Sequence, residues 1–146
     1  MMMTLKIVNT SHHPLPNYET AGASGMDLRA FVPEPIVLGP LERTLVPTGL
    51  FMEIPEGYEG QVRPRSGLSI KHGISLVNCV GTIDSDYRGE LKIPVINLSN
   101  IPYAIHDGER IAQLVIASYT RVEPVEVEDI TSTNRGKGGF GSTGTK

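Results

Sequence analysis

Carboxylates that could act on a water molecule lie between two apolar runs near the middle of the chain. Residues 80–91 contain three carboxylates, a tyrosine and an arginine, and the runs at 75–77 and 91–98 favour strands. This pattern predicts a hairpin whose tip carries polar side chains. Because binding and catalytic residues concentrate on loops that a rigid sheet holds, we expect chemistry at this tip.

Asp84 is the carboxylate of the tip that best suits a general base. It directly follows the apolar residues 81–83, where an ionised side chain is less expected than in a solvated turn. A partly desolvated aspartate can take a proton from water, although a solvated turn remains the alternative. A calcium loop is excluded, because Arg88 occupies a ligand position and Val95 stands where a glutamate is required.

A second group of residues that could bind an anion begins at Arg65. It precedes a short predicted helix at residues 66–73, with Ser66 as the expected N-cap and Gly73 as the expected C-terminal cap. Free amides at a helix N-terminus and a guanidinium group both favour phosphate. Without further support, the same residues also fit an ordinary capped helix with a surface arginine.

The C-terminal segment is rich in glycine, serine, threonine and asparagine from Thr131 onward. We expect a core domain at residues 1–130 and a mobile tail at 131–146, which lacks the apolar residues to fold alone. Glycine amides can wrap an anion, and Phe140 could stack on a flat base. A Walker A loop is excluded, because Ser142 stands where lysine is required. Composition leaves phosphate binding and a flexible linker equally open.

The whole-chain composition excludes several classes of protein. The 146 residues fit one domain, and the net charge of −3 argues against a surface that coats nucleic acid. A single cysteine, Cys79, excludes an internal disulfide and fits a reducing compartment. We see no signal peptide and no membrane-spanning run, so we expect a cytoplasmic protein without membrane partners. The four histidines lack metal-ligand spacing, and we expect structural or surface roles for them.

The elements that must position these residues are short and rich in β-formers. Scattered glycines and prolines separate them at intervals of about 8–12 residues, which predicts an all-β sandwich or barrel with one short helix. The run at 110–119 is apolar on both faces and should be buried or lie at a subunit contact. The runs at 36–38 and 44–47 should flank a turn at Gly39 and Pro40. We expect strands at residues 5–9, 27–31, 36–38, 44–47, 49–54, 58–63, 75–77, 91–98, 101–105, 110–119 and 122–127.

Taken in order, five segments of the chain resemble the five motifs of the trimeric deoxyuridine triphosphatase (dUTPase) family. The resemblance covers the chain from Ala21 onward and implies a distorted jelly roll or β-barrel. It also implies a homotrimer with an exchanged C-terminal segment and three active sites at subunit interfaces, each closed by a tail. The matching segments are residues 23–28, 64–68, 81–89, 108–114 and 135–144.

The implied reaction is the Mg²⁺-dependent hydrolysis of dUTP to dUMP and pyrophosphate by attack of water on the α-phosphorus. Such an enzyme limits uracil incorporation into DNA and supplies dUMP for dTMP synthesis. A triphosphate needs positioning and charge neutralisation more than covalent catalysis, which suits the residue types found here.

The resemblance also implies a role for each matching residue. Asp84 would activate the water, Tyr87 would pack under the deoxyribose and exclude a 2′-hydroxyl, and Asn78 would read uracil with nearby backbone groups. Phe140 would stack on the base, and Asp27 would contact Mg²⁺ only through water. The implied substrate-binding residues are Arg65, Ser66, Gly67, Asn78, Gly81, Thr82, Ile83, Tyr87, Lys92, Gln113, Arg135, Phe140, Gly141, Ser142 and Thr143.

Two alternatives keep a similar fold. A dCTP deaminase would share the jelly roll but would need a glutamate base beside the pyrimidine, which we do not find in the matching motif. A non-catalytic trimeric β-protein would bind a nucleotide or a protein and would have no use for Asp84. Pyrophosphate release from dUTP distinguishes both alternatives from a dUTPase.

Overall fold

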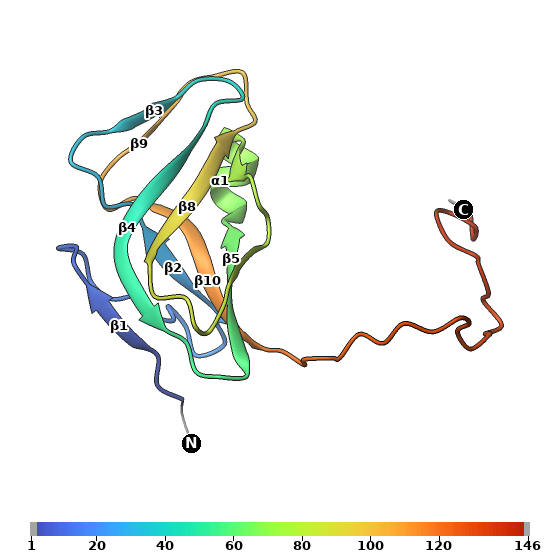
Figure 1. Ribbon diagram of the computed structural model, residues 1–146. Coiled ribbons are helices and arrows are strands. Elements are labelled where there is room, and N and C mark those ends of the chain that lie inside the picture. Colours follow the sequence, from blue (N-terminus) through green and yellow to red (C-terminus); the bar gives the residue numbers. More distant parts are fainter. Residues whose placement is uncertain (1–2, 145–146) are drawn as a thin grey trace.

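The computed structural model describes residues 3–144, which form ten strands and one helix. The strands make two four-stranded sheets, in the orders β1-β4-β8-β6 and β2-β10-β5-β7, and a small sheet of β3 and β9 (Figure 1). The strands in contact within these sheets are antiparallel. The elements are β1 (Lys6–Asn9), β2 (Gly25–Arg29), β3 (Ile36–Leu38), β4 (Arg43–Glu53), β5 (Tyr58–Pro64), α1 (Ser66–His72), β6 (Ile74–Leu76), β7 (Gly81–Ile83), β8 (Glu90–Asn97), β9 (Tyr103–Ile105) and β10 (Arg110–Ser118).

One hydrophobic core fills the space between the two larger sheets. Strand alternation produces it, since every second residue of β8 is buried from Leu91 to Asn97. Leu28 of β2, Ile93 of β8 and Leu114 of β10 have no exposed surface and belong to this core. The all-β fold with one short helix confirms the prediction. Within residues 3–144, no helix is long and apolar enough to cross a membrane.

Strand β4 is one continuous strand, whereas the sequence predicted two strands at 44–47 and 49–54. A bulge explains the difference, because Pro47 pairs with Lys92 while Phe51 pairs with Glu90. At the bulge, the buried Thr48 hydroxyl donates to the Leu91 carbonyl over 2.6 Å. Gly49 adopts a φ of +69°, which glycine tolerates without a steric penalty. The strand therefore bends here without ending.

The small sheet contains the predicted strand at 36–38, and the predicted turn after it is also present. Strand β3 pairs with β9, with Val37 opposite Ala104, a partner that the sequence did not indicate. The fully buried Asn97 holds this sheet to the core. Its side-chain amide donates to the Leu38 carbonyl over 3.0 Å and to the Ile101 carbonyl over 2.8 Å.

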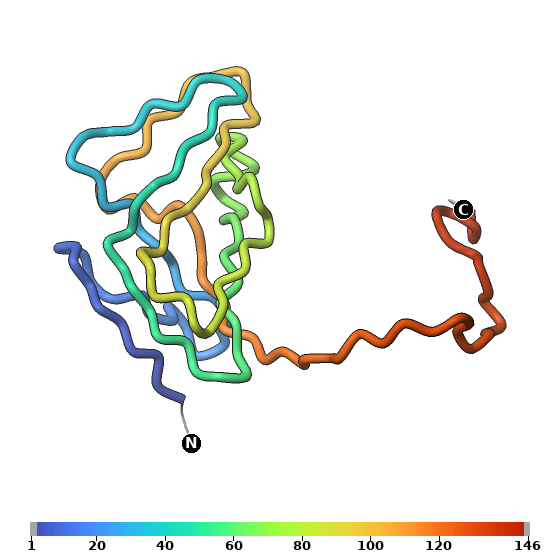
Figure 2. The backbone as a smooth tube through the Cα atoms, in the orientation of Figure 1, coloured from blue at the N-terminus to red at the C-terminus, as the bar shows by residue number. Residues whose placement is uncertain are grey.

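The predicted strand at 122–127 is wrong for the single chain. Beyond β10 the chain runs away from the body as an extended segment without strand pairing (Figure 2). Val122 and Val125 are 80% and 71% exposed. Alternation alone does not make a strand, because the backbone groups need a partner that residues 3–144 of one chain do not supply.

Candidate active site

The predicted hairpin around Asp84 is confirmed, and its tip bridges the two larger sheets. Strand β6 pairs with β8 in one sheet, with Leu76 opposite Val95. Between them, β7 crosses to the other sheet and pairs with β5, with Ile83 opposite Gly60. A Cβ at Gly60 would lie 3.2 Å from Ile83 and 2.9 Å from Ile54, so the close approach of β7 requires a glycine there. Asp84 therefore directly follows a strand, β7, whose position is fixed by its pairing with β5.

A cavity of about 400 Å³ lies beside this hairpin. It brings together five of the residues that the sequence singled out, while Asp84 itself is exposed. The partial burial expected for the Asp84 carboxylate is therefore absent in the single chain. The residues that line the cavity are Leu45, Thr82, Ile83, Asp84, Tyr87, Glu90, Leu91 and Lys92.

The side chains of the loop after Asp84 hold its shape. The Tyr87 hydroxyl donates to the Glu90 carbonyl over 2.9 Å, and its ring lies so close to Gly89 that no Cβ fits there. Arg88 donates through Nη1 to the carbonyls of Ser85 and Tyr87, over 2.7 and 3.0 Å. Arg88 therefore supports the loop, which leaves Tyr87 as the aromatic surface of the cavity.

Asn78 lies next to the first residue of β7. A Cβ at Gly81 would come within 3.3 Å of the Asn78 Nδ2 atom. Gly81 is buried, whereas Asn78 is exposed at the entrance to the tip. The amide group is therefore free to meet a ligand in the hairpin.

Glu90 anchors the base of the hairpin, a role that the sequence analysis missed. Its Oε1 accepts a hydrogen bond from the Gly49 amide over 3.0 Å, at the bulge of β4. Its Oε2 lies 3.6 Å from the Lys92 Nζ atom. The bulge and the hairpin are thus joined by one carboxylate. The only sequence signal was the position of Glu90 at the edge of the acidic tip.

The helix after Arg65 begins one residue earlier than its predicted cap implied. Arg65 is the N-cap, with φ −97° and ψ 130°, and Ser66 is the first helical residue. No side chain caps this end, so the first-turn amides, which have no partner within a helix, stay available. Gly73 ends the helix with φ +69°, as the sequence predicted.

Asp27 lies between two guanidinium groups. Its Oδ1 is 2.9 Å from Arg65 Nε, and its Oδ2 is 3.2 Å from Arg110 Nη1. Arg65 also donates through Nη1 to the Arg110 carbonyl over 3.0 Å. Gln113 is the cross-strand neighbour of Asp27 and donates to the Pro64 carbonyl over 3.0 Å. The three predicted residues Asp27, Arg65 and Gln113 thus form one cluster, in which Arg65 has a fixed orientation.

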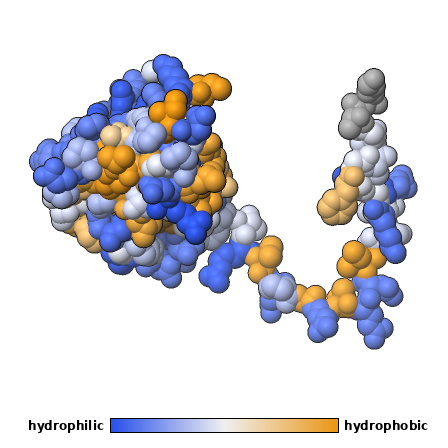
Figure 3. Space-filling view, turned by 90° about the horizontal axis from the view of Figure 1, so that it is seen from above, coloured by the Kyte–Doolittle hydropathy of each residue, from blue (hydrophilic) through white to orange (hydrophobic). Residues whose placement is uncertain are grey.

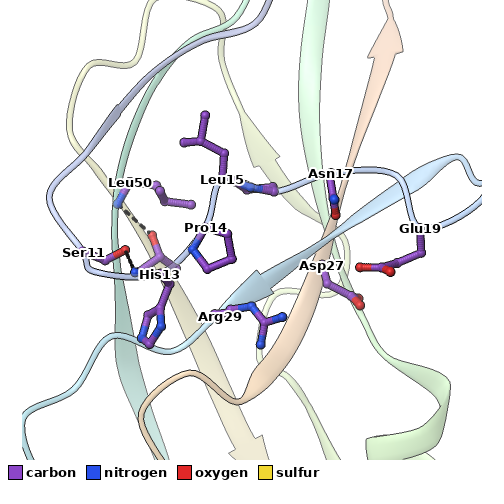
Figure 4. Close-up of a pocket in the computed structure, with 11 residues that line it drawn as sticks. Ser11, His13, Pro14, Leu15, Asn17, Glu19, Asp27, Arg29 and Leu50 are labelled. Atoms are coloured by element: carbon purple, nitrogen blue, oxygen red, sulfur yellow. Dashed lines mark hydrogen bonds between the residues drawn. The ribbon is translucent and has the colours of Figure 1, made fainter.

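Asp27 also borders a small cavity under the loop at residues 11–19. The cavity holds about 120 Å³, and Asp27 and Glu19 lie at the same end of it (Figure 4). Arg110 Nη1 is 3.9 Å from Glu19 Oε1 and 3.2 Å from Asp27 Oδ2, which places both carboxylates around one cation. The Arg110 guanidinium group therefore partly balances the negative charge of Glu19 and Asp27.

The donor set at Asp27 fits a magnesium ion held through water but not one held directly. Mg²⁺ takes oxygen ligands and usually keeps several waters, with substrate phosphates completing its shell. Both Asp27 oxygens are already ion-paired. Among residues 3–144, three potential ligand residues converge only at His12, His13 and Asp107, outside this cluster.

The tail residues lie apart from both the hairpin and the Asp27 cluster. Beyond Tyr119, whose amide donates to the Gly57 carbonyl, no hydrogen bond joins the described tail to the body. Arg135 Nε donates to the Gly138 carbonyl within the tail, and Phe140 is fully exposed. Figure 3 shows the tail as a thin projection beside the body. The roles expected for Arg135, Phe140, Gly141, Ser142 and Thr143 stay predictions.

Comparison with known proteins agrees with this arrangement. The dUTPase family model matches residues 11–144. The chain is 63% identical to the deoxyuridine 5′-triphosphate nucleotidohydrolase of Finegoldia magna, over 97% of this chain and 99% of that protein. It is 57% identical to the protein of the same name from Cytophaga hutchinsonii, over 99% of this chain and 94% of that one.

Solved structures give the same result. A variant dUTPase of Staphylococcus bacteriophage 80alpha with dUpNHpp superposes with a TM-score of 0.88 at 30% identity, covering 99% of this chain and all of that one. A variant dUTPase of phage phi11, described as coordinating a structural Mg(II) ion, has a TM-score of 0.80 at 27% identity, over 89% of this chain and all of that one. The family match spans the hairpin, the Asp27 cluster and the tail together. The chain belongs to the dUTPase family.

Proposed function

We propose that this chain hydrolyses dUTP to dUMP and pyrophosphate. The hairpin cavity carries the proposal, because a carboxylate, an aromatic surface and backbone polar groups meet there in a member of the dUTPase family. The reaction removes a uracil nucleotide that could enter DNA and yields dUMP for dTMP synthesis. We expect it to take place in the cytoplasm.

Asp84 acts as the general base in this proposal. Its exposed carboxylate, at the end of a strand fixed by β5, takes a proton from the water that attacks the α-phosphorus. The Tyr87 ring packs under the deoxyribose and leaves no room for a 2′-hydroxyl. The Asn78 amide and the backbone of Thr82, Ile83 and Lys92 read the edge of uracil.

Arg65 binds the phosphates with an orientation set before the substrate arrives. Its Nε and Nη1 atoms are bonded to Asp27 and to the Arg110 carbonyl, so the Nη2 atom is left to donate to a phosphate oxygen. Ser66 and Gly67 add amides of the first helical turn, and Gln113 lies beside them. Preorganised donors of this kind stabilise charge without reorganisation during the reaction.

Magnesium, when bound with the triphosphate, would neutralise charge on the phosphate oxygens. Asp27 would reach such an ion only through its water shell, because both carboxylate oxygens serve Arg65 and Arg110. Asp27 therefore has a second task, which is to hold Arg65.

The active form is a homotrimer in this proposal, with each active site built from three chains. Three features of the single chain support it: an exposed Asp84, a described tail with no hydrogen bond to its own body, and the exposed alternating segment at 122–127. A neighbouring chain would pair with this segment and receive the tail. There, Arg135, Ser142 and Thr143 close over the outer phosphates beside Gly141, and Phe140 stacks on uracil.

A substrate panel tests the proposal. Purified protein with Mg²⁺ is incubated with dUTP, dCTP, dTTP or UTP, and pyrophosphate and nucleotide products are measured. We expect pyrophosphate from dUTP alone. The dCTP arm is needed because Glu90 lines the cavity, although Gly49 and Lys92 already engage it. Conversion of dCTP to dUTP, or binding of dUTP without turnover, would overturn the proposal.

A further inference from the structure

Three residues that the proposed nucleotide site does not use meet where the N-terminal loop contacts the turn before β10. His12 Nε2 lies 2.8 Å from Asp107 Oδ2, and His13 Nε2 lies 3.0 Å from Asp107 Oδ1. One ligand atom from each of the three residues lies within 4.8 Å of the other two. Asp107 is 94 residues beyond His13, so the spacing of the histidines alone could not reveal this cluster.

The surrounding structure holds the cluster in place. The Val32 amide donates to Asp107 Oδ1 over 3.0 Å, which fixes the carboxylate from the side of the body. The His13 ring is mostly buried and would lie only 3.1 Å from a Cβ at Gly108. Asn9 fixes the backbone of the loop by donating to the His13 carbonyl over 2.8 Å. The exposed His12 ring, whose centroid is 4.2 Å from that of His13, is the outer member of the set.

We propose that His12, His13 and Asp107 form a site for a divalent transition-metal ion such as Zn²⁺. Two imidazole nitrogens and one carboxylate oxygen are a ligand set that zinc accepts, with water as the fourth ligand. Ligands at about 2.0–2.1 Å from a tetrahedral ion are about 3.3 Å apart. If Oδ2, which the Val32 amide leaves free, is the carboxylate ligand, its 2.8 Å distance to His12 Nε2 must open by about half an ångström, and His13 must turn from Oδ1 toward the ion. The ligand atoms of all three residues already lie within 4.8 Å of one another, so this adjustment is small. The ion would replace the hydrogen bonds that now join the rings to the carboxylate.

The protein already supplies an outer shell for such an ion. A metal ligand is oriented when its other polar atoms are hydrogen-bonded, and the Val32 amide does this for Asp107. Magnesium would not compete, because it prefers oxygen ligands over imidazole. A bound ion would join residues 11–19, which line the cavity beside Asp27, to the turn at 106–109. It would stabilise the loop without taking part in the hydrolysis.

The test uses the full-length, nucleotide-free protein after treatment with EDTA and removal of the chelator. Zn²⁺ is titrated by calorimetry in the presence of excess Mg²⁺, and the melting temperature is measured with and without the ion. We expect one site per chain and a higher melting temperature, because an ion that binds only the folded chain stabilises it. Weak binding at several sites, or no binding, would overturn the proposal.

Variants identify the ligands. His12→Gln changes an exposed ring, so the fold should survive, and we expect at least a tenfold loss of Zn²⁺ affinity. Asp107→Asn should cause a similar or larger loss. His106→Ala is the matched control, since this exposed ring is next to Asp107 but outside the cluster. Substituted Co²⁺ should give the visible absorption of a tetrahedral site. An equal loss of affinity in His106→Ala, or an octahedral Co²⁺ spectrum, would contradict the assignment.

Discussion

The body of this chain and the segment beyond β10 differ in how far their apolar side chains are buried. In the body, alternating apolar residues such as Ile93 and Leu114 are completely buried. In the segment beyond β10, which includes the end of the predicted core domain and the tail from Thr131, the apolar residues Val122, Ile130 and Phe140 are exposed, at 80%, 89% and 115% of their reference areas. The body therefore folds on its own contacts, whereas the apolar residues of the tail are left for a partner. Alternation in the sequence marks the buried residues of the body, but it also marks residues 122–127, which are exposed, so periodicity alone does not separate the two kinds of residue.

The difference has an energetic cause. Fixing one residue costs about 1–2 kcal/mol of backbone conformational entropy, which buried apolar area normally offsets. The tail has short turns, such as the one in which the Gly138 amide donates to the Arg135 carbonyl, but no apolar burial. The contacts of the described residues alone therefore do not order the tail, which agrees with the proposed role of the nucleotide and of neighbouring chains in ordering it.

The largest expected effect is on kcat, through Asp84 in the body of the chain. We expect Asp84→Asn to lower kcat by about 10²–10⁴, the usual worth of a positioned base, while nucleotide binding is kept. Pyrophosphate release and binding of a non-hydrolysable dUTP analogue measure the two properties. Glu56→Gln is the control, because Glu56 is an exposed carboxylate of the groove of about 760 Å³ that Asp84 also borders. Unchanged turnover in Asp84→Asn would remove Asp84 from its role.

The difference in burial between the body and the segment beyond β10 also predicts a difference in how substitutions change the free energy of unfolding. Leu114→Ala should lower the free energy of unfolding by about 2–5 kcal/mol, because it opens a cavity in the core. Val125→Ala should change it by less than about 0.5 kcal/mol in the isolated chain, since Val125 is 71% exposed. Urea denaturation measures both changes. A large loss in Val125→Ala at low protein concentration would mean that the tail helps to fold its own body.

Truncation after Asn134 separates the two regions directly. We expect the melting temperature to be kept, because no hydrogen bond joins the missing residues to the body. We expect the oligomeric state to be kept as well, because the segment at 122–127, which pairs with a neighbouring chain in the proposed trimer, is retained. We expect kcat/KM to fall by about 10²-fold or more, since base stacking and charged hydrogen bonds each contribute about 1–3 kcal/mol. Calorimetry, light scattering and steady-state kinetics with dUTP give the three values. An unfolded truncated protein would contradict the division between body and tail.

The smallest expected effect is a pH dependence within the body. Burial and the hydrogen bond to Glu109 raise the pKa of Tyr103 well above its usual range. A tyrosine whose pKa is raised by folding contributes stability that is fully present below about pH 10 and is lost as the pH rises further. Tyr103→Phe should therefore cost about 1 kcal/mol at pH 7 and progressively less above pH 10.

Urea denaturation between pH 7 and pH 11 tests this dependence. Tyr119→Phe, at the start of the tail, is the control, because no side-chain hydrogen bond of Tyr119 is found among residues 3–144. The difference between the wild type and Tyr103→Phe should shrink with rising pH, and that for Tyr119→Phe should stay constant. A difference for Tyr103→Phe that does not depend on pH would contradict the role of Glu109.

Local patterns in the sequence predicted most of the body. Alternation located the strands, and the hairpin that carries Asp84 is confirmed by the pairing of β6 with β8. Long-range polar contacts were not predictable. Asn97 bonds to the Leu38 carbonyl 59 residues away, and Asp27 pairs with Arg65 of another element. Such contacts depend on the tertiary arrangement, which no short pattern encodes. The strand expected at 122–127 was wrong for a related reason, because none of the described residues 3–144 supplies a strand for it to pair with.

The path of β7 has a mechanical consequence. Because β7 belongs to one sheet and β8 to the other, the loop with Asp84 is attached to both faces of the sandwich. A small slip of one sheet over the other would shift the carboxylate relative to the nucleotide. Substitutions between the sheets that are milder than Leu114→Ala should therefore lower turnover by a larger factor than their small effect on stability would suggest, because they displace Asp84 without unfolding the core.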